Sequence, residues 1–266
     1  GLFEIGLALV RIENPHIKLS EHVAKDFMAT ESAIGILGKE ATYLYKKRHE
    51  TISSGDLREH TFDHKKMSEI LDGDQRKLIQ KVKTIISDPL FRYQEFENLN
   101  EQREQVLNWC TDLAKQGFGS WAYPHHAGGK DDMEGYFTIM ETLSFHDLSM
   151  VIKFGVQFGL WGMSIYFLGT EKHHHKYLRD IGSLKLPGCF AMTETGHGSN
   201  VRGLETTATY NHLDQTFTIH TPHPDARKEY IGNAALHGKM ATVFAKLIIE
   251  GEDYGVNAFV VPLRSD

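Results

Sequence analysis

A glycine-rich loop with several hydroxyl side chains is the first candidate for chemistry. The stretch GCFAMTETGHGSN begins at Gly188 and ends at Asn200. Gly196 and Gly198 tolerate unusual dihedral angles, so successive backbone amides can point into one concavity and attract an anion. The hydroxyl donors of the stretch are Thr193, Thr195 and Ser199. The composition fits either a phosphate-binding loop or a polar turn at the end of a strand, and the spacing alone identifies no ligand.

Two familiar nucleotide-binding motifs are excluded. In a G-x-G-x-x-G fingerprint that starts at Gly196, the third glycine would fall at Val201, and the following residues are typical of a hairpin rather than a helix. No helix N-terminus would therefore face a pyrophosphate. The AGGKDD stretch around Gly128 and Lys130 lacks the spacing and the hydroxyl residue of a P-loop, so we interpret it as a turn.

The histidines suggest a metal site, but their spacing argues against one. His173–His175 are consecutive, so on a helix they point in different directions and cannot all face one ion. His60 and His64 are four residues apart, yet no third ligand lies nearby at the usual spacing. The chain also has no H-E-x-x-H and no G-x-S-x-G motif. We therefore predict solvated helix faces, no metal site and no metalloprotease or serine-hydrolase chemistry.

The composition is that of an ordinary globular protein. The chain has 266 residues, 41% hydrophobic and 24% charged, with a net charge of −6. This length allows one large domain or two smaller ones. The acidic balance gives no electrostatic support for a nucleic-acid partner. Cys110 and Cys189 form no paired motif, which favours a reducing compartment over a disulfide scaffold.

The first apolar stretch is GLFEIGLALVRIE, at residues 1–13. We predict an amphipathic helix rather than a signal peptide, because no basic segment precedes it and Glu4 interrupts it. The first residue is glycine, so the native start is processed or missing, and Met28 is an alternative start.

The second apolar stretch, residues 148–168, is long enough to span a membrane. Lys153 and Gln157 lie inside it, and a helix that is apolar nearly all round is also typical of a protein core. We therefore predict a buried helix and no membrane span. We expect a neighbouring backbone to approach closely at its glycines, which are Gly155, Gly159 and Gly162.

Helical spacing of apolar residues dominates the first half of the chain. Over residues 74–86 these residues fall on one face, with Asp74 as the expected N-cap and Ser87–Pro89 as the stop. Three more helices are predicted over 106–117, 133–143 and 169–183, the last short and mostly exposed.

Near residue 187 the pattern changes to that of strands. The stretch 205–222 predicts a hairpin, and two further strands are predicted at 240–251 and 256–263, joined through EGEDYG. Helices first and strands later, without β-α-β alternation, predict an α+β fold rather than a doubly wound parallel sheet. The chain ends at Asp266 soon after a strand, so we expect the β-domain to be incomplete.

From about residue 57 to 266 the chain resembles the acyl-CoA oxidases of the acyl-CoA dehydrogenase superfamily. The stretches that carry the resemblance are CFAMTETGHGSNVRGLETTATY, ILDGDQRKLIQKVKTIISDPLF, YPHHAGGKDDMEGYFTIMETLSFHDLSMVIKFGVQFGLWG, LGTEKHHHKYL and KEYIGNAALHGKMATVFAKLIIEGEDYGVNAFVVPLR. The family has an N-terminal helical domain, an antiparallel, barrel-like middle β-domain and a C-terminal helical bundle. The resemblance implies a helical segment of unclear role at 1–56, the helical domain at 57–186, a truncated β-domain at 187–266 and no C-terminal bundle.

The resemblance also implies a reaction. An acyl-CoA oxidase uses FAD to convert acyl-CoA to trans-2-enoyl-CoA, and O2 reoxidises the flavin to give H2O2. The implied partners are acyl-CoA, O2 and a second copy of the full-length protein, with no nucleic acid and no membrane. The implied compartment is the cytoplasm in bacteria or the peroxisomal matrix in eukaryotes, without secretion. The alternatives are an acyl-CoA dehydrogenase that uses an electron-transfer flavoprotein and a non-catalytic FAD- or acyl-CoA-binding scaffold.

The resemblance transfers a set of flavin contacts to this chain. Thr193 matches a threonine whose hydroxyl and amide contact the pyrimidine edge of the flavin, where a fixed donor stabilises developing negative charge. Ser199 matches the turn near the FAD pyrophosphate and the CoA arm, so it is also a substrate-binding candidate. The full set of implied cofactor contacts is Met192, Thr193, Gly198, Ser199, Tyr230 and Gly232.

No catalytic residue is expected in this chain. The family's general base is a glutamate of the C-terminal domain, and abstraction of an α proton needs a carboxylate within hydrogen-bond reach. Neither Glu194 nor Glu205 matches that base, and Glu205 is expected to pair with Arg202 three residues away. The chain alone is therefore expected to be inactive.

One position separates oxidases from dehydrogenases. The dehydrogenases commonly have threonine where Gly232 stands, and GAGSD where this chain has GHGSN. Our hypothesis is that the missing side chain leaves room for O2 beside the flavin.

Overall fold

The computed structural model describes residues 63–264. The helix predicted at 1–13, the segment 1–56, Met28 and His60 therefore lie outside the described residues. By its contacts the chain divides into the unit Gly1–Ser68 and the unit Glu69–Asp266. Helix α4 (His64–Asp72) crosses this boundary, and all other elements below belong to the second unit.

The helices predicted in the first half are confirmed. They are α5 (Arg76–Ile86), α6 (Leu99–Lys115) and α7 (Met133–Ser144), with short 3-10 turns at Gly73–Gln75, Pro89–Phe91 and His125–Ala127. Asp74 as N-cap of α5 is wrong. The chain is already helical in α4 and passes through the Gly73–Gln75 turn, so Asp74 lies inside that turn and Gln75 takes the cap position.

The long apolar helix has a π-helical middle. It consists of α8 (Leu148–Phe154), the π segment η4 (Gly155–Trp161) and α9 (Gly162–Leu168). Its mean hydropathy of 1.3 and its 21 residues would suffice for a membrane span, but 44% of that window is buried in the structure. Its buried members include Phe154, Phe158 and Trp161, none of them exposed to solvent. This burial supports the prediction of a core helix.

Side chains, rather than a backbone, approach the glycines of this helix. A Cβ at Gly159 would lie 2.7 Å from the hydroxyl oxygen of Tyr136. At Gly162 the hydroxyl of Tyr123 occupies the space that a Cβ would need. At Gly155 the nearest atom is the methyl carbon of Met140. The expected close backbone approach is therefore wrong, and the glycines instead make room for large side chains of neighbouring elements.

A second π segment follows in the helical run 171–182. The run comprises α10 (Glu171–His173), η5 (His174–Leu178) and α11 (Arg179–Gly182). Leu178 and Ile181 have no exposure and join Trp161 in one apolar cluster. The predicted exposed helix is thus present, with one face buried.

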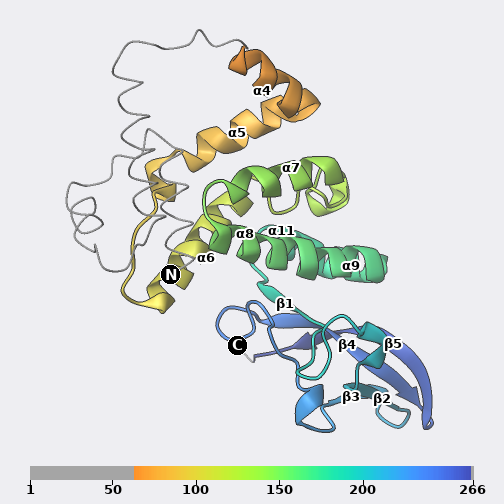
Figure 1. Cartoon of the computed structure of the whole chain (residues 1–266). Helices are drawn as coiled ribbons and strands as arrows, with labels where there is room; N and C mark the ends of the chain where they lie inside the picture. The colour runs from red at the N-terminus through yellow and green to blue at the C-terminus, as the bar shows by residue number, and fades with distance from the viewer. Residues whose placement is uncertain (1–62, 265–266) are drawn as a thin grey trace, which may run out of the picture. The chain divides into compact units, whose positions relative to one another are not determined.

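The β-part is a five-stranded mixed sheet. Its strands are β1 (Gly188–Ala191), β2 (Thr207–Asn211), β3 (Thr216–His220), β4 (Met240–Ile249) and β5 (Glu252–Pro262). Short 3-10 turns lie at Val201–Gly203 and Pro224–Ala226. Figure 1 shows β1 leaving the helices and entering the sheet.

Strand β4 is the centre of this sheet. One edge of β4 pairs in parallel with β1, where Gly188 faces Met240, and then with β2, where Ala208 faces Leu247. Antiparallel pairs join β2 to β3 and β4 to β5. The predicted α+β class and hairpin are confirmed, whereas the two parallel pairs depart from a purely antiparallel sheet. The β4–β5 connection is only Glu250–Gly251, both with positive φ, so the expected EGEDYG linker is too long.

The core extends from the helices to the first strand. The largest apolar cluster includes Trp109 and Trp121 among the helices, and Cys189 lies in a third cluster within the sheet. Cys110 and Cys189 are both free and buried.

Candidate functional site

The loop after β1 is a tight turn that pairs with a distant segment. Within the turn, the amide of His197 donates to the carbonyl of Glu194 at 3.1 Å. The amide of Thr195 donates to the carbonyl of Arg227 at 2.9 Å, and that of Glu229 donates to the carbonyl of Thr193 at 3.1 Å. This pairing places the predicted loop Met192–Thr193 directly beside the segment that leads to Tyr230 and Gly232.

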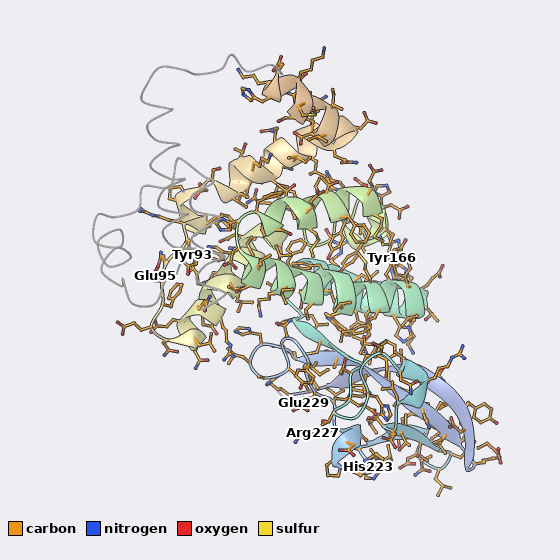
Figure 2. The ribbon with its side chains drawn as sticks, viewed as in Figure 1. Tyr93, Glu95, Tyr166, His223, Arg227 and Glu229 are labelled. Carbon is orange, nitrogen blue, oxygen red and sulfur yellow. The ribbon has the colours of Figure 1, made fainter. Side chains whose placement is uncertain are left out.

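The side chains of the second segment reinforce the pairing. The hydroxyl of Thr195 lies 2.8 Å from one carboxylate oxygen of Glu229, and the guanidinium of Arg227 lies 3.2 Å from the other. Arg227, Glu229 and His223 are grouped in the β-part in Figure 2. The two candidate segments are therefore joined by backbone and side-chain contacts.

A buried carboxylate anchors the turn. Glu194 is 1% exposed, and its oxygens accept from the amides of Glu205 and Thr206 at 2.8 and 2.9 Å. They also accept from the hydroxyl of Thr206 at 2.6 Å and from Nζ of Lys228 at 3.1 Å. Burial raises the pKa of Glu194, but these hydrogen bonds outweigh burial and hold the pKa below its usual value. A carboxylate so engaged is a structural anchor and a weak base.

Glu205 has different partners from the one expected. Its carboxylate oxygens lie 3.1 Å from Nε2 of His197 and 3.2 Å from Nε2 of His223. The expected pair with Arg202 is wrong, because Arg202 lies in the Val201–Gly203 turn while Glu205 faces the two histidines. His197 thus takes part in the hydrogen bonding of the turn, as predicted.

Several donors of the loop face no partner among the described residues. The amide and the hydroxyl of Thr193 make no hydrogen bond within this part of the chain, and neither do the amide and hydroxyl of Ser199. Gly198 and Ser199 are exposed, and a Cβ at Gly198 would meet nothing within 4 Å. Met192 uses its carbonyl to accept from Nζ of Lys228 at 2.9 Å.

Tyr230 and Gly232 lie where the second segment turns back toward the helices. Tyr230 has a φ of 59° and is 87% exposed, and a bulky residue in the left-handed region is strained. A Cβ at Gly232 would lie 2.9 Å from Cγ2 of Val156 in η4. The structure therefore brings Met192 and Thr193 close to the segment of Tyr230 and Gly232, while Ser199 and Gly198 lie beyond the Glu194 turn.

Sequence analysis does not identify the polar residue that holds the start of β1 to the helices. Gln157, fully buried in η4, accepts from the amide of Gly188 at 2.9 Å and donates to the carbonyls of Ile181 and Leu186 at 3.2 and 3.0 Å. The sequence does show Gln157 and Lys153 as long polar side chains inside an apolar stretch. Their hydrogen-bond partners could not be predicted from the sequence, because these partners lie 24 or more residues away.

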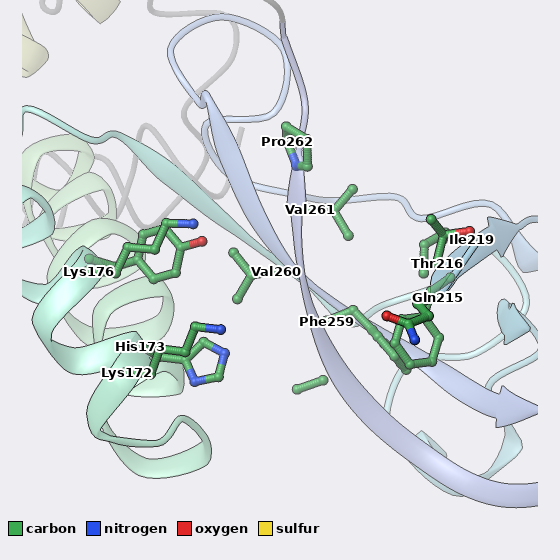
Figure 3. Close-up of a pocket in the computed structure, with 13 residues that line it drawn as sticks. Lys172, His173, Lys176, Gln215, Thr216, Ile219, Phe259, Val260, Val261 and Pro262 are labelled. Atoms are coloured by element: carbon green, nitrogen blue, oxygen red, sulfur yellow. The ribbon is translucent and has the colours of Figure 1, made fainter. Parts of the chain in front are cut away.

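A separate open groove of about 620 Å³ lies between the 171–182 helical run and strands β3 and β5. Lys172, His173 and Lys176 line one wall, while Phe259 and Val260 are among the apolar residues opposite (Figure 3). None of the predicted flavin contacts lines this groove. Among the described residues no cluster of three metal-ligating side chains occurs.

The helical part followed by the mixed sheet matches the acyl-CoA dehydrogenase type of fold in solved structures. Residues 72–185 match the family described as the acyl-CoA dehydrogenase N-terminal domain. The resemblance to the acyl-CoA oxidases is confirmed, since the chain is similar to these enzymes in sequence and in structure.

Acyl-CoA oxidases are among the similar curated proteins and the similar solved structures. A peroxisomal acyl-coenzyme A oxidase 2 of Arabidopsis thaliana is 54% identical over 171 residues, which cover 62% of this chain and 24% of the relative. The crystal structure of acyl-CoA oxidase 3 from Yarrowia lipolytica is 34% identical with a TM-score of 0.66, covering 77% of this chain and 29% of that one. Acyl-CoA oxidase 2 of Caenorhabditis elegans, solved with FAD, ascaroside-CoA and ATP, is 26% identical with a TM-score of 0.61, covering 77% and 30%. The chain thus spans about a quarter of the length of the curated relatives that it matches.

Proposed function

We propose that this chain supplies part of the FAD-binding site of an acyl-CoA oxidase. We call this part the flavin shelf, and its residues are Met192, Thr193, Gly198, Ser199, Tyr230 and Gly232. The observation that carries the proposal is the pairing of Thr193 and Thr195 with Arg227 and Glu229. This pairing joins the two segments that the resemblance assigns to the flavin, although more than thirty residues separate them in the sequence. A similar oxidase of Caenorhabditis elegans is bound with FAD, which supports a flavin as the cofactor.

The free donors of the shelf suit the acceptor groups of FAD. A flavin pyrimidine edge and a pyrophosphate present oxygen and nitrogen acceptors. Thr193 offers an amide and a hydroxyl with no partner among the residues described, and Ser199 offers the same pair in an exposed turn. We assign Thr193 to the flavin ring and Gly198 and Ser199 to phosphate, with Met192, Tyr230 and Gly232 as further contacts.

FAD, when bound, accepts the hydride removed from the acyl-CoA substrate. The residues of this chain orient the cofactor and stabilise charge, and they do not abstract the proton. Glu194 is committed to Thr206, Glu205 and Lys228, and Glu205 to His197 and His223. Neither carboxylate is free to act as the general base.

For the whole protein we propose the oxidase reaction, with acyl-CoA and O2 as substrates, a homodimer and a peroxisomal location. The names of the plant relatives support the location. We retain the domain assignment of a helical domain at 57–186 and a β-domain at 187–266, preceded by a segment at 1–56.

The proposal is tested by the flavin spectrum of the purified chain and by its response to acyl-CoA without oxygen. We expect bound flavin absorbance after FAD is added, and acyl-CoA should perturb that spectrum. In the longer protein the same addition should bleach the flavin, and admission of air should produce H2O2. A chain that binds no FAD overturns the shelf, while bleaching that is reversed by a flavoprotein acceptor and not by O2 identifies a dehydrogenase.

A further inference from the structure

A chain of polar contacts ties the turn after Gly232 to the helices. Nζ of Lys153, in α8, lies 2.6 Å from Oδ1 of Asn233 and 2.8 Å from Nδ1 of His237. Nε2 of His237 lies 2.8 Å from Oε1 of Glu104 in α6. Two helices are therefore linked to one turn of the β-part through a single lysine and a single histidine.

The same turn is tied to the strand that leads into the flavin shelf. Nδ2 of Asn233 donates to the carbonyl of Gly188 at 3.0 Å, and Gly188 is the first residue of β1. The carbonyl of Asn233 accepts from the amide of Gly238 at 2.8 Å, which closes the turn. Asn233 has a φ of 67°, a left-handed conformation that asparagine adopts more readily than most residues. Through the side chain of Asn233, Lys153 is thereby connected both to the turn that follows Gly232 and to the start of β1, which leads to Thr193.

The proton positions in this network follow from the donors. A lysine ammonium has no acceptor, so Nδ1 of His237 accepts from Lys153 while Nε2 carries the proton that is donated to Glu104. A second proton on the imidazole removes the acceptor and places two cations 2.8 Å apart. The contact between Lys153 and His237 therefore exists only while the imidazole is neutral.

The other charged and titratable groups around the network do not replace this contact. Burial lowers the pKa of Lys153, while the negative charge of Glu104 acts in the opposite direction. Burial raises the pKa of Cys110 to about 12 and that of Cys189 to about 11, so both thiols remain neutral at physiological pH. Arg264, two residues beyond β5, donates to the backbone carbonyls of Gly238 and Ala234.

We propose that Lys153 is a positioning residue that fixes the turn 233–238, and with it Tyr230 and Gly232, beside Thr193, and that it does so only while His237 is neutral. The inference rests on the proposed flavin shelf. It makes FAD affinity depend on pH through a residue that does not touch the cofactor.

The test compares the full 266-residue chain with three variants, Lys153→Met, His237→Gln and His212→Gln. Glutamine keeps an acceptor and a donor but gains no proton, and His212 is an exposed histidine on Glu250 that serves as the control. FAD affinity is measured by flavin fluorescence from about pH 8 to about pH 5.5. Hydrogen exchange of the amides 230–238, corrected for intrinsic rates, is measured on the flavin-free chain.

We expect the wild type and His212→Gln to lose FAD affinity about tenfold on acidification, together with amide protection of the turn. His237→Gln should lose neither, and Lys153→Met should bind weakly and lack protection at every pH. Affinity and protection that are insensitive to pH, or unchanged in Lys153→Met, overturn the positioning role alone. If the wild type binds no FAD at any pH, the proposed function itself is overturned. If Lys153→Met does not fold by circular dichroism, the contrast between the wild type and His237→Gln decides.

Discussion

Oε1 of Glu194 lies 3.1 Å from Nζ of Lys228, and the two side chains are 0% and 13% exposed. This buried ion pair joins the turn after β1 to the segment before Tyr230. Because the carboxylate also accepts from Thr206 and Glu205, one side chain holds three stretches of the β-part together.

Removal of this charge should destabilise the chain. In Glu194→Gln the amide group turns a donor toward groups that are themselves donors, so we expect a loss of about 3 kcal/mol in the free energy of unfolding. Lys228→Met should cost less, because three other donors to the carboxylate remain. Urea unfolding of both variants and of the double variant gives the coupling energy. Additive effects in that cycle would contradict a direct pair.

The carboxylate of Glu194 should make the free energy of unfolding depend on pH, and the direction of this dependence follows from its pKa. Its pKa is lowered in the folded chain, so the folded state binds this proton less readily than the unfolded state does. The stabilisation is complete above the pKa of an unperturbed glutamate, about 4.3, and is lost as the pH falls through the lower folded value. The stability difference between wild type and Glu194→Gln should therefore shrink below about pH 4. A constant difference down to acid pH would show that the charge plays no part.

The glycine at 232 has a packing role that must be separated from any role toward O2. A Cβ there would lie 2.9 Å from Cγ2 of Val156, so Gly232→Thr alone should destabilise the chain by about 1–3 kcal/mol. Val156→Ala removes the obstruction, and Gly232→Thr with Val156→Ala should recover most of that stability.

The double variant is also the fair test of the oxygen hypothesis. If Gly232 leaves room for O2, flavin reoxidation in the longer protein should be slower in the double variant than in Val156→Ala alone, with FAD still bound. Equal reoxidation rates would leave packing as the reason for the glycine.

Tyr230 should show opposite effects on stability and binding. Its φ of 59° is unfavourable for a bulky residue, and its exposed ring contributes little to the core. Tyr230→Gly should therefore leave the melting temperature unchanged or raise it slightly, while it weakens FAD binding about tenfold through loss of the aromatic contact. Reduced stability with unchanged affinity would assign the tyrosine a purely structural role.

The sequence predicted the elements better than the contacts between them. Periodicity identified the helices and the hairpin, because each follows from local spacing of apolar residues. The parallel pairing of β1 and β2 with β4 was not predictable in this way, since it joins residues about 40 to 50 positions apart. The anchoring of Glu194 was missed for the same reason, as its partner Lys228 is 34 residues away.

The candidate site was predicted by resemblance and not by spacing. Motif rules excluded a dinucleotide fingerprint at Gly196 but could not name a ligand. Thr193 and Gly232 were assigned together only because both matched the oxidases, and the structure then supplied the hydrogen bonds that bring their segments side by side.

Thr193 is proposed to present free donors to FAD, and a comparison of two threonines in the same turn tests this role most directly. Thr193→Val and Thr195→Val each remove one hydroxyl from the same turn, but the hydroxyl of Thr195 is already bonded to Glu229 at 2.8 Å. FAD affinity is measured by titration with both variants and the wild type, at equal fold stability. We predict that Thr193→Val binds FAD about tenfold more weakly, while Thr195→Val binds within about twofold of wild type. Equal affinity of Thr193→Val and the wild type would contradict the account.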